Sequence, residues 1–308
     1  RQRLEYIFPD TEDITRVIIE DRLESLYNER HPEWEVNHNP NGLKLYINSR
    51  VMINEDIIEA IKSLKLAECI LYDGVIVAAC TEVGWDDGLD LSHMTVINPD
   101  SISLYNNISD LVHDNGRMIR WDFEHVFYEA DNYFETELGV TVLHPYNIWI
   151  GDNVTLSPNV VLDASEGPII IDSGTKVIAN SVLTGPFYIG KDSLVKIGAK
   201  IYGNVSIGPV FKIGGEVEGS IFQAYSNKQH DGFLGHAFIG EWVKLGADTN
   251  NSDLKNTYKD VHMYNYVSKN KINTRYQFMG CEIGDHSKTG INTSLNTGVV
   301  IGTACNIY

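Results

Sequence analysis

Aliphatic residues in the second half of the chain recur at every sixth position. Helical amphipathicity repeats every 3.6 residues and a half-buried strand every 2, so an unbroken period of six needs another explanation. Short parallel strands stacked as the coils of a β-helix supply one, with one inward aliphatic side chain per hexapeptide and three hexapeptides per turn. The uninterrupted series is Ile171, Val177, Leu183, Ile189, Val195, Ile201, Ile207 and Ile213. This pattern predicts a parallel β-helix over residues 140–308.

The spacing extends to both sides of this run, with gaps. Ile-Gly pairs place a flexible residue just after an inward position, where the backbone must turn a corner. The further inward positions that we expect are Ile150, Leu156 and Leu162, then Ile221, Asn227, Phe233, Ile239 and Leu245, and finally Ile283, Thr289, Leu295, Ile301 and Ile307. The phase is lost in a polar segment after Leu245. We expect residues 249–277 to form a functional loop or an interface arm.

The sequence of residues 1–120 predicts a different fold class, a mixed α/β region. We expect a strand over 43–48 and a helix over 55–64, with Asn54 as its N-cap. Asp73-Gly74 lies between the apolar segments 69–72 and 75–80, and such a dipeptide predicts the turn of a β-hairpin.

A second helix is expected over residues 121–138, where five aromatic and aliphatic side chains offer apolar contacts. Gly139 follows at the position of a helix C-cap. We therefore expect a connector helix over residues 121–139 between the α/β region and the β-helix.

The charge of the chain is unevenly distributed. The formal net charge is −18, and residues 1–140 hold 28 acidic and 11 basic side chains, whereas the remainder is nearly neutral. Nucleic-acid binding needs a basic stripe, which neither half offers. No apolar run is long enough to span a membrane, and the N-terminus has no signal-peptide pattern, so we expect a cytoplasmic protein.

The four cysteines form no CxxC motif, which fits a reducing compartment and predicts no metal site.

His230 is the candidate general base. It follows a polar patch, residues 226–229, that interrupts the hexapeptide pattern, and an imidazole can accept a proton near neutral pH. The alternative is that His230 is a surface-turn histidine without a catalytic role. His236 lies one hexapeptide later, and we interpret it as a coil-corner residue. Zinc held by His230 and His236 is a weaker hypothesis, because residues 145–229 offer no third histidine.

Basic side chains occur around His230 and along the polar segment. They could provide a field for phosphate groups, or they could be solvated lysines at coil corners. They are Lys228, Lys244, Lys255, Lys269, Lys271 and Arg275. Asn250 and Asn251 could hydrogen-bond a substrate or only shape the turn.

The stretch from His230 to Gly240, followed by Leu245-Gly-Ala-Asp-Thr249, resembles a known family. Hexapeptide repeats of this kind are similar to those of the left-handed β-helix acyltransferases. The motif His-x3-Leu-Gly-x3-Ile-Gly-x4-Leu-Gly-Ala resembles a motif of one family. That family is the bifunctional N-acetylglucosamine-1-phosphate uridyltransferase/glucosamine-1-phosphate acetyltransferase family. Segments 46–51, 226–230 and 249–255 resemble a shorter, divergent bacterial branch, whose members are often catalogued as sugar-phosphate nucleotidyltransferases.

This resemblance implies a homotrimer that binds acetyl-coenzyme A between neighbouring β-helices. It implies that His230 acts as general base, that Gly246 and Ala247 contact the coenzyme, and that the amino-sugar phosphate meets five side chains. These are Lys228, Phe233, Lys244, Asn250 and Asn251. Phe233, Lys244, Asp248 and Glu218 depart from the better-known branch.

Nucleotidyl transfer would belong to the first region, and it is implied by the resemblance alone. Residues 1–140 contain isolated glycines and no Gly-rich phosphate loop, so we expect an incomplete nucleotidyltransferase-like region over 1–120, in which acidic side chains could hold Mg²⁺. The sequence thus predicts acetyl-coenzyme A-dependent N-acetylation of an amino-sugar phosphate, with possible transfer from a nucleoside triphosphate. The alternative is a non-catalytic β-helix scaffold or a sugar-nucleotide-binding protein.

Overall fold

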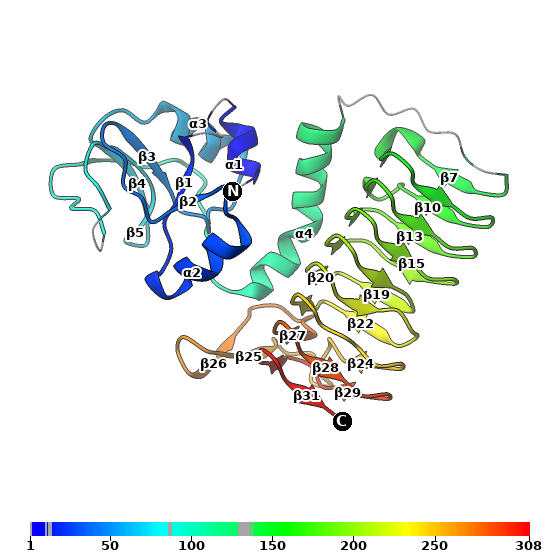
Figure 1. Ribbon diagram of the computed structural model, residues 1–308. Coiled ribbons are helices and arrows are strands. Elements are labelled where there is room, and N and C mark those ends of the chain that lie inside the picture. Colours follow the sequence, from blue (N-terminus) through cyan, green and yellow to red (C-terminus); the bar gives the residue numbers. More distant parts are fainter. Residues whose placement is uncertain (1, 10, 12–13, 86–87, 129–135, 137) are drawn as a thin grey trace. The chain divides into compact units, whose positions relative to one another are not determined.

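The computed structural model describes residues 2–9, 11, 14–85, 88–128, 136 and 138–308 (Figure 1). The chain folds as two compact units, residues 1–106 and residues 107–308. Among the described residues, no helix is long and apolar enough to cross a membrane.

The first unit is mixed α/β, as predicted. A four-stranded sheet has the order β3-β5-β4-β6, in which only β4 and β6 run parallel. The helices and strands of this unit are α1 (Gln2–Ile7), β1 (Arg16–Val17), α2 (Asp21–Arg30), β2 (Glu35–Val36), β3 (Lys44–Ile47), α3 (Glu55–Ser63), β4 (Glu68–Tyr72), β5 (Val75–Thr81) and β6 (Thr95–Ile97).

Two local predictions in this unit are confirmed. The side chain of Asn54 accepts a hydrogen bond from the backbone N–H of Ile57 and so caps α3. β4 and β5 form an antiparallel hairpin in which Tyr72 pairs with Val75. Asp73 and Gly74 both have positive φ, the conformation that a two-residue hairpin turn requires.

The second unit is a parallel β-helix, which confirms the predicted fold class of this region. Its handedness stays a prediction. The first sheet contains β7 (Thr141–Leu143), β10 (Val161–Asp163), β13 (Val182–Thr184), β16 (Lys200–Ile201), β19 (Glu216–Glu218) and β22 (Phe233–Gly235). The second contains β8 (Ile148–Ile150), β11 (Ile169–Ile171), β14 (Phe187–Ile189), β17 (Val205–Ile207), β20 (Ile221–Phe222), β23 (Phe238–Ile239), β27 (Cys281–Ile283) and β30 (Val299–Ile301).

The third sheet contains β9 (Thr155–Leu156), β12 (Lys176–Val177), β15 (Leu194–Val195), β18 (Lys212–Ile213) and β21 (Asn227–Lys228). A bridge through Lys244 continues this sheet to the pair β28 (Lys288–Thr289) and β31 (Asn306–Ile307). β24 (Asn250–Asn251) pairs with β29 (Ser294–Leu295). Near the start of the β-helix, a 3₁₀-helix spans Pro145–Asn147.

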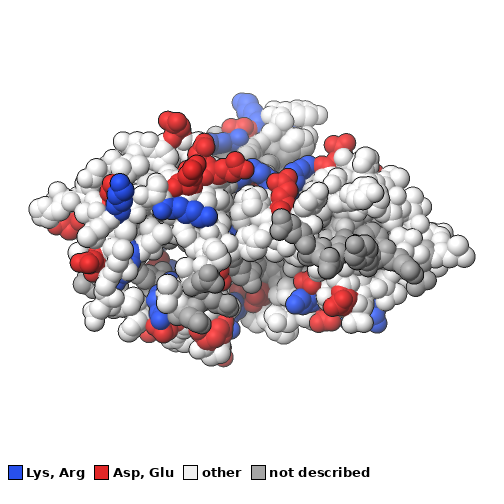
Figure 2. Space-filling model, turned by 90° about the horizontal axis from the view of Figure 1, so that it is seen from above, with Lys and Arg blue, Asp and Glu red and all other residues white. Residues whose placement is uncertain are grey.

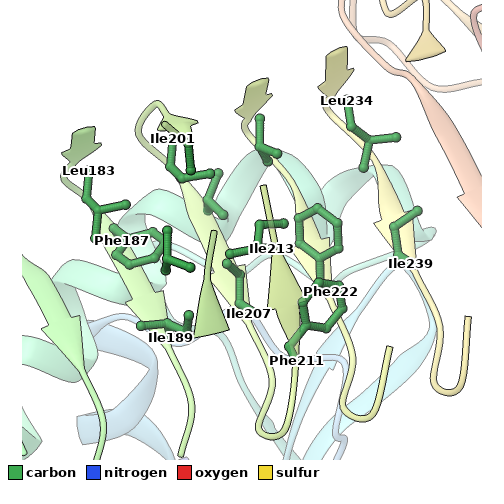
Figure 3. Packing of buried hydrophobic residues seen from close by; sticks show 14 of the residues in the cluster. Leu183, Phe187, Ile189, Ile201, Ile207, Phe211, Ile213, Phe222, Leu234 and Ile239 are labelled. Atoms are coloured by element: carbon green, nitrogen blue, oxygen red, sulfur yellow. The ribbon is translucent and has the colours of Figure 1, made fainter. Parts of the chain in front are cut away.

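All eight residues of the uninterrupted series point inward and are at most 1% exposed. Figure 3 shows several of them stacked in layers with Phe187, Phe211 and Phe222. Lys176 pairs with Leu194 and Leu194 with Lys212, so each of these coils has 18 residues, three hexapeptides. The period of six therefore predicts this part of the core correctly.

The predicted inward positions Ile221, Asn227 and Phe233 are wrong by one residue. The buried inward residues there are Phe222, Lys228 and Leu234. The coils shorten after Ile213, because Lys200 pairs with Glu216 and Ser206 with Ile221 instead of with residues 18 further on. Ile239 and Leu245 are buried as predicted.

The predicted connector helix begins earlier than expected. The helix α4 spans Ile108–Asp122 and continues as a π-helix over Phe123–Phe127. Residues 129–135 and 137 of the expected helix lie outside the described residues, and Thr136 and Leu138 are not helical. Asn107 and Asp110 form a capping box, a start signal that the apolar pattern did not reveal.

α4 lies along the outer face of the second sheet (Figure 1). Its contact face includes polar residues, which explains why hydrophobic periodicity did not detect it. Asn115 donates to the carbonyl of Asn204 at 2.8 Å and accepts from the hydroxyl of Ser206 at 2.7 Å. Gly116 allows close approach, since a Cβ there would lie 1.8 Å from Oδ1 of Asn204.

The polar segment leaves the coil later than the expected start at residue 249, because β24 still pairs with β29 of the next coil. It contains an antiparallel hairpin of β25 (His262–Asn265) and β26 (Asn270–Asn273). The next coil resumes where Phe238 pairs with Glu282.

Candidate functional site

His230 lies on an exposed corner between β21 and β22. Its imidazole makes no hydrogen bond with any described residue, whereas its backbone carbonyl accepts one from Nζ of Lys228 at 2.9 Å. The structure therefore leaves the ring open to solvent and fixes the backbone beneath it. This arrangement is compatible with a base that meets an external substrate.

Lys228 lies inside the β-helix. Its side chain is 2% exposed, and Nζ also donates to the carbonyl of Gly214 at 3.1 Å. Burial lowers the pKa of Lys228 to about 8, although the charges of Asp231, Asp248 and Glu216 oppose this shift. Two carbonyl oxygens already accept hydrogen bonds from its ammonium group. Its predicted contact with a substrate stays a prediction.

Two neighbouring asparagines bind the backbone of the preceding coil. Asn251 is buried, accepts from the N–H of Gly235 at 2.8 Å and donates to the carbonyl of Gly235 at 2.9 Å. Asn250 accepts from the N–H of Phe233 at 2.8 Å and donates to the carbonyl of Asp248 at 2.7 Å. These contacts favour the turn-shaping alternative for both residues, and their role toward a substrate stays a prediction.

The proposed coenzyme-contacting residues lie at the next corner. A Cβ on Gly246 would lie 2.2 Å from the carbonyl oxygen of Gly290, so the coil stacking requires glycine there. The carbonyl of Ala247 accepts from the N–H of Asn292 at 2.8 Å. Asp248 is exposed on the same corner, with a positive φ.

The basic residues predicted as a cluster are distributed over separate elements. Lys228 points inward, whereas Lys244 is exposed on the third sheet. Lys255 donates to the carbonyl of Asp260 at 2.6 Å. Lys271 lies in β26 and Lys269 directly before it, and Arg275 follows that strand.

A second group of polar side chains, which the sequence pattern did not reveal, closes the base of the excursion. Nδ1 of His236 lies 2.8 Å from a carboxylate oxygen of Asp253. The ring of His236 stacks on that of His113 from α4, with centroids 5.6 Å apart, and His113 stacks on Tyr276 at 3.7 Å. Burial lowers the pKa of His113. His236 has the positive φ of a coil corner, and in addition it anchors the loop.

The described residues contain no cluster of three or more His, Cys, Asp or Glu side chains that could hold a metal ion. In the first unit, a shallow depression is lined by Asp56, Glu59 and Asp100 together with uncharged residues. On the face shown in Figure 2, acidic and basic side chains are interspersed among uncharged ones.

One protein family and several known proteins are similar in sequence to this chain. Residues 1–129 match the family described as sugar nucleotidyl transferase. A bifunctional GlmU protein from Nostoc sp. is 29% identical over 184 residues, which cover 53% of this chain and 37% of that protein. A bifunctional sugar-1-phosphate nucleotidylyltransferase/acetyltransferase from Sulfurisphaera tokodaii is 31% identical over 179 residues, which cover 53% of this chain and 43% of that protein. The chain thus spans less than half the length of these relatives.

A solved structure, a UDP-N-acetylglucosamine acyltransferase from Campylobacter jejuni, matches 54% of this chain and 69% of its own chain. The sequence identity is 10% and the TM-score is 0.20. The pairing of the strands themselves defines the parallel β-helix. The sequence relatives confirm the resemblance to the bifunctional transferases that the hexapeptide motif predicted.

Proposed function

We propose that this chain, related in sequence to bifunctional sugar-phosphate transferases, N-acetylates an amino-sugar phosphate in nucleotide-sugar biosynthesis. Acetyl-coenzyme A is the donor and His230 the general base. The observation that carries this proposal is the exposed imidazole of His230 on a coil corner that Lys228 fixes from inside.

The chemistry requires a base at this point. An amine attacks a thioester only when its lone pair is free, and a proton must leave the nitrogen as the new bond to carbon forms. A neutral imidazole accepts that proton, and such general-base assistance contributes about 10²–10⁴-fold to a rate. Because its ring has no partner among the described residues, His230 is available for this task.

Lysines beside this corner favour the binding of anionic ligands. The strand register of the third sheet places Lys212, Asn227, Lys244 and Lys288 in one outward column. Adjacent strands are about 4.8 Å apart, so Lys244 and Lys288 repel each other in the absence of a counter-charge. His230 follows Asn227 at the edge of this sheet. The column can therefore attract the phosphates of the donor and the sugar phosphate.

The resemblance also supplies the proposed assembly. We propose a cytoplasmic homotrimer in which Gly246 and Ala247 face the coenzyme and Phe233, Lys244 and Asn250 line the sugar site. The backbone groups at these corners are already ordered by coil stacking, which reduces the entropy lost when a ligand binds.

A second activity is favoured by the family match over residues 1–129. We propose sugar-1-phosphate nucleotidyl transfer with Mg²⁺ for the protein to which this region belongs. Release of pyrophosphate from UTP and N-acetylglucosamine-1-phosphate measures this activity. No release with Mg²⁺ at millimolar concentration would contradict it.

The acetyltransferase proposal is tested by thiol release from acetyl-coenzyme A in the presence of glucosamine-1-phosphate. We expect sugar-dependent release that His230→Ala reduces by about two orders of magnitude or more. His144, another exposed histidine at a coil corner, supplies the control variant His144→Ala. The scaffold alternative would be supported if calorimetry detected no binding of acetyl-coenzyme A at millimolar concentration.

A further inference from the structure

A half-open groove of about 360 Å³ lies on the outer face of the second sheet, beside the first residue of α4. Phe238, Val300, Ile108 and Tyr266 contribute apolar and aromatic surface, and Glu282 lies between Phe238 and Val300 in the sheet register. The volume is in the range of small-molecule sites. His230 lies at the edge between the other two sheets, so this groove is a separate place in the β-helix.

The carboxyl group of Glu282 is the unusual feature of the groove. It makes no hydrogen bond or ion pair with any described residue, although the residue is only partly exposed. Desolvation raises the pKa of Glu282 to about 7, and no neighbouring charge contributes to the shift. An apolar side chain would fill this position at lower cost, since an unpaired buried carboxylate is unfavourable.

The other titratable side chains that line the groove are Asp285 and Tyr266. The carboxylate of Asp285 accepts from the N–H of Glu241 at 2.9 Å. No lysine, arginine or histidine is among the described residues that line it. The groove is therefore acidic, which disfavours phosphates and favours a cation. Aromatic rings such as Phe238 and Tyr266 add attraction for a cation within about 6 Å of a ring centroid.

We propose that this groove binds a small molecule that carries a protonated amine on an apolar or aromatic body, with the ammonium group on Glu282. The ammonium would donate a charge-assisted hydrogen bond to the otherwise unpartnered carboxylate, and its apolar body would lie between the aromatic and aliphatic walls. This site goes beyond the proposed acetyl transfer and does not depend on it, because the anionic ligands of that reaction have the opposite charge.

Benzylammonium is a suitable probe, and benzyl alcohol is its neutral counterpart. Binding of each is measured by ligand-observed NMR to the wild type, to Glu282→Gln and to Glu166→Gln. Glu166 is an exposed glutamate elsewhere on the β-helix, so its substitution controls for net charge. Glu282→Gln keeps the side-chain shape and removes a buried unpaired charge, so we expect it to fold at least as stably as the wild type.

We expect benzylammonium to bind Glu282→Gln at least tenfold more weakly than the wild type and Glu166→Gln, as loss of a charge-assisted hydrogen bond requires. Wild-type affinity should rise between pH 6 and pH 8 as Glu282 ionises, whereas that of Glu282→Gln should not. Equal affinity of the wild type and Glu282→Gln, or no binding to the wild type at tens of millimolar, would overturn the proposal. Equal binding of benzyl alcohol and benzylammonium would also contradict it.

Discussion

The β-helix contains two stretches built on the same hexapeptide plan but with different regularity. From Ile171 to Ile213 every sixth residue is aliphatic and at most 1% exposed. From Gly214 to Asn251 the coils shorten, and their inward positions include the ammonium of Lys228 and the amide of Asn251. In the regular coils the inward positions of the period-six series are all apolar, whereas in the irregular coils two inward positions hold polar groups that need specific hydrogen bonds. The irregular stretch carries His230, so the departures from the repeat coincide with the candidate site.

The largest stability effect is expected in the regular stretch. Leu183→Ala removes a fully buried side chain from stacked layers that cannot collapse, and it should lower the free energy of unfolding by about 2–5 kcal/mol. Leu194 points outward on the third sheet and is partly exposed, so Leu194→Ala should cost about 1 kcal/mol or less. Chemical denaturation measures both. Equal losses would contradict the assigned inward face.

Lys228 gives the irregular stretch a distinct pH dependence. Its folded-state pKa is about 8, against an ordinary value of 10.5, so between these pH values the unfolded chain binds more protons than the folded one. Wild-type stability should therefore rise from pH 8 to pH 10.5 by up to about 3 kcal/mol relative to Lys228→Met. Denaturation of both proteins across this range measures the difference. A difference that does not change with pH would show that the ammonium is not buried.

Asn251 tests whether polar inward residues hold the shortened coils together. In Asn251→Asp the carboxylate can no longer donate to the carbonyl of Gly235 and faces that oxygen instead. We expect a loss of about 1–3 kcal/mol in the free energy of unfolding. Asn306→Asp, in an exposed strand position, is the control and should change stability by less than about 0.5 kcal/mol. A loss no larger than that of the control would sink the structural role of Asn251.

The smallest effect is expected at the base of the excursion. Asp253→Asn weakens the contact with His236 and should leave global stability within about 1 kcal/mol. Its consequence is local, because the N–H of Gly280 donates to the carbonyl of His236 where the loop rejoins the coil. Hydrogen exchange of the Gly280 amide should accelerate, whereas exchange at Ile189 should not. Unchanged exchange at Gly280 would contradict the anchoring role.

The same contrast explains how far the sequence alone predicts this molecule. The period of six located the regular coils, and short-range signals located the cap of Asn54 and the turn at Asp73-Gly74. These features depend on neighbours close in sequence or on a strict repeat.

The remaining features depend on contacts distant in sequence. The start of α4 was missed because buried Ser109, Asn115 and Gly116 interrupt its apolar face. The one-residue shift to Phe222 follows from shortened coils that a fixed period cannot represent. For the candidate site, the motif indicated His230, whereas the inward position of Lys228 required the strand register.

If the imidazole of His230 acts as a base, added imidazole should rescue a variant that lacks it. Single-turnover acetyl transfer to glucosamine-1-phosphate is measured for the wild type, His144→Ala and His230→Ala, with and without added imidazole. We predict that His230→Ala loses two or more orders of magnitude in rate, that imidazole restores part of it in proportion to its neutral form, and that His144→Ala is unaffected. A rate for His230→Ala within a few-fold of the wild type would show that His230 is not the general base.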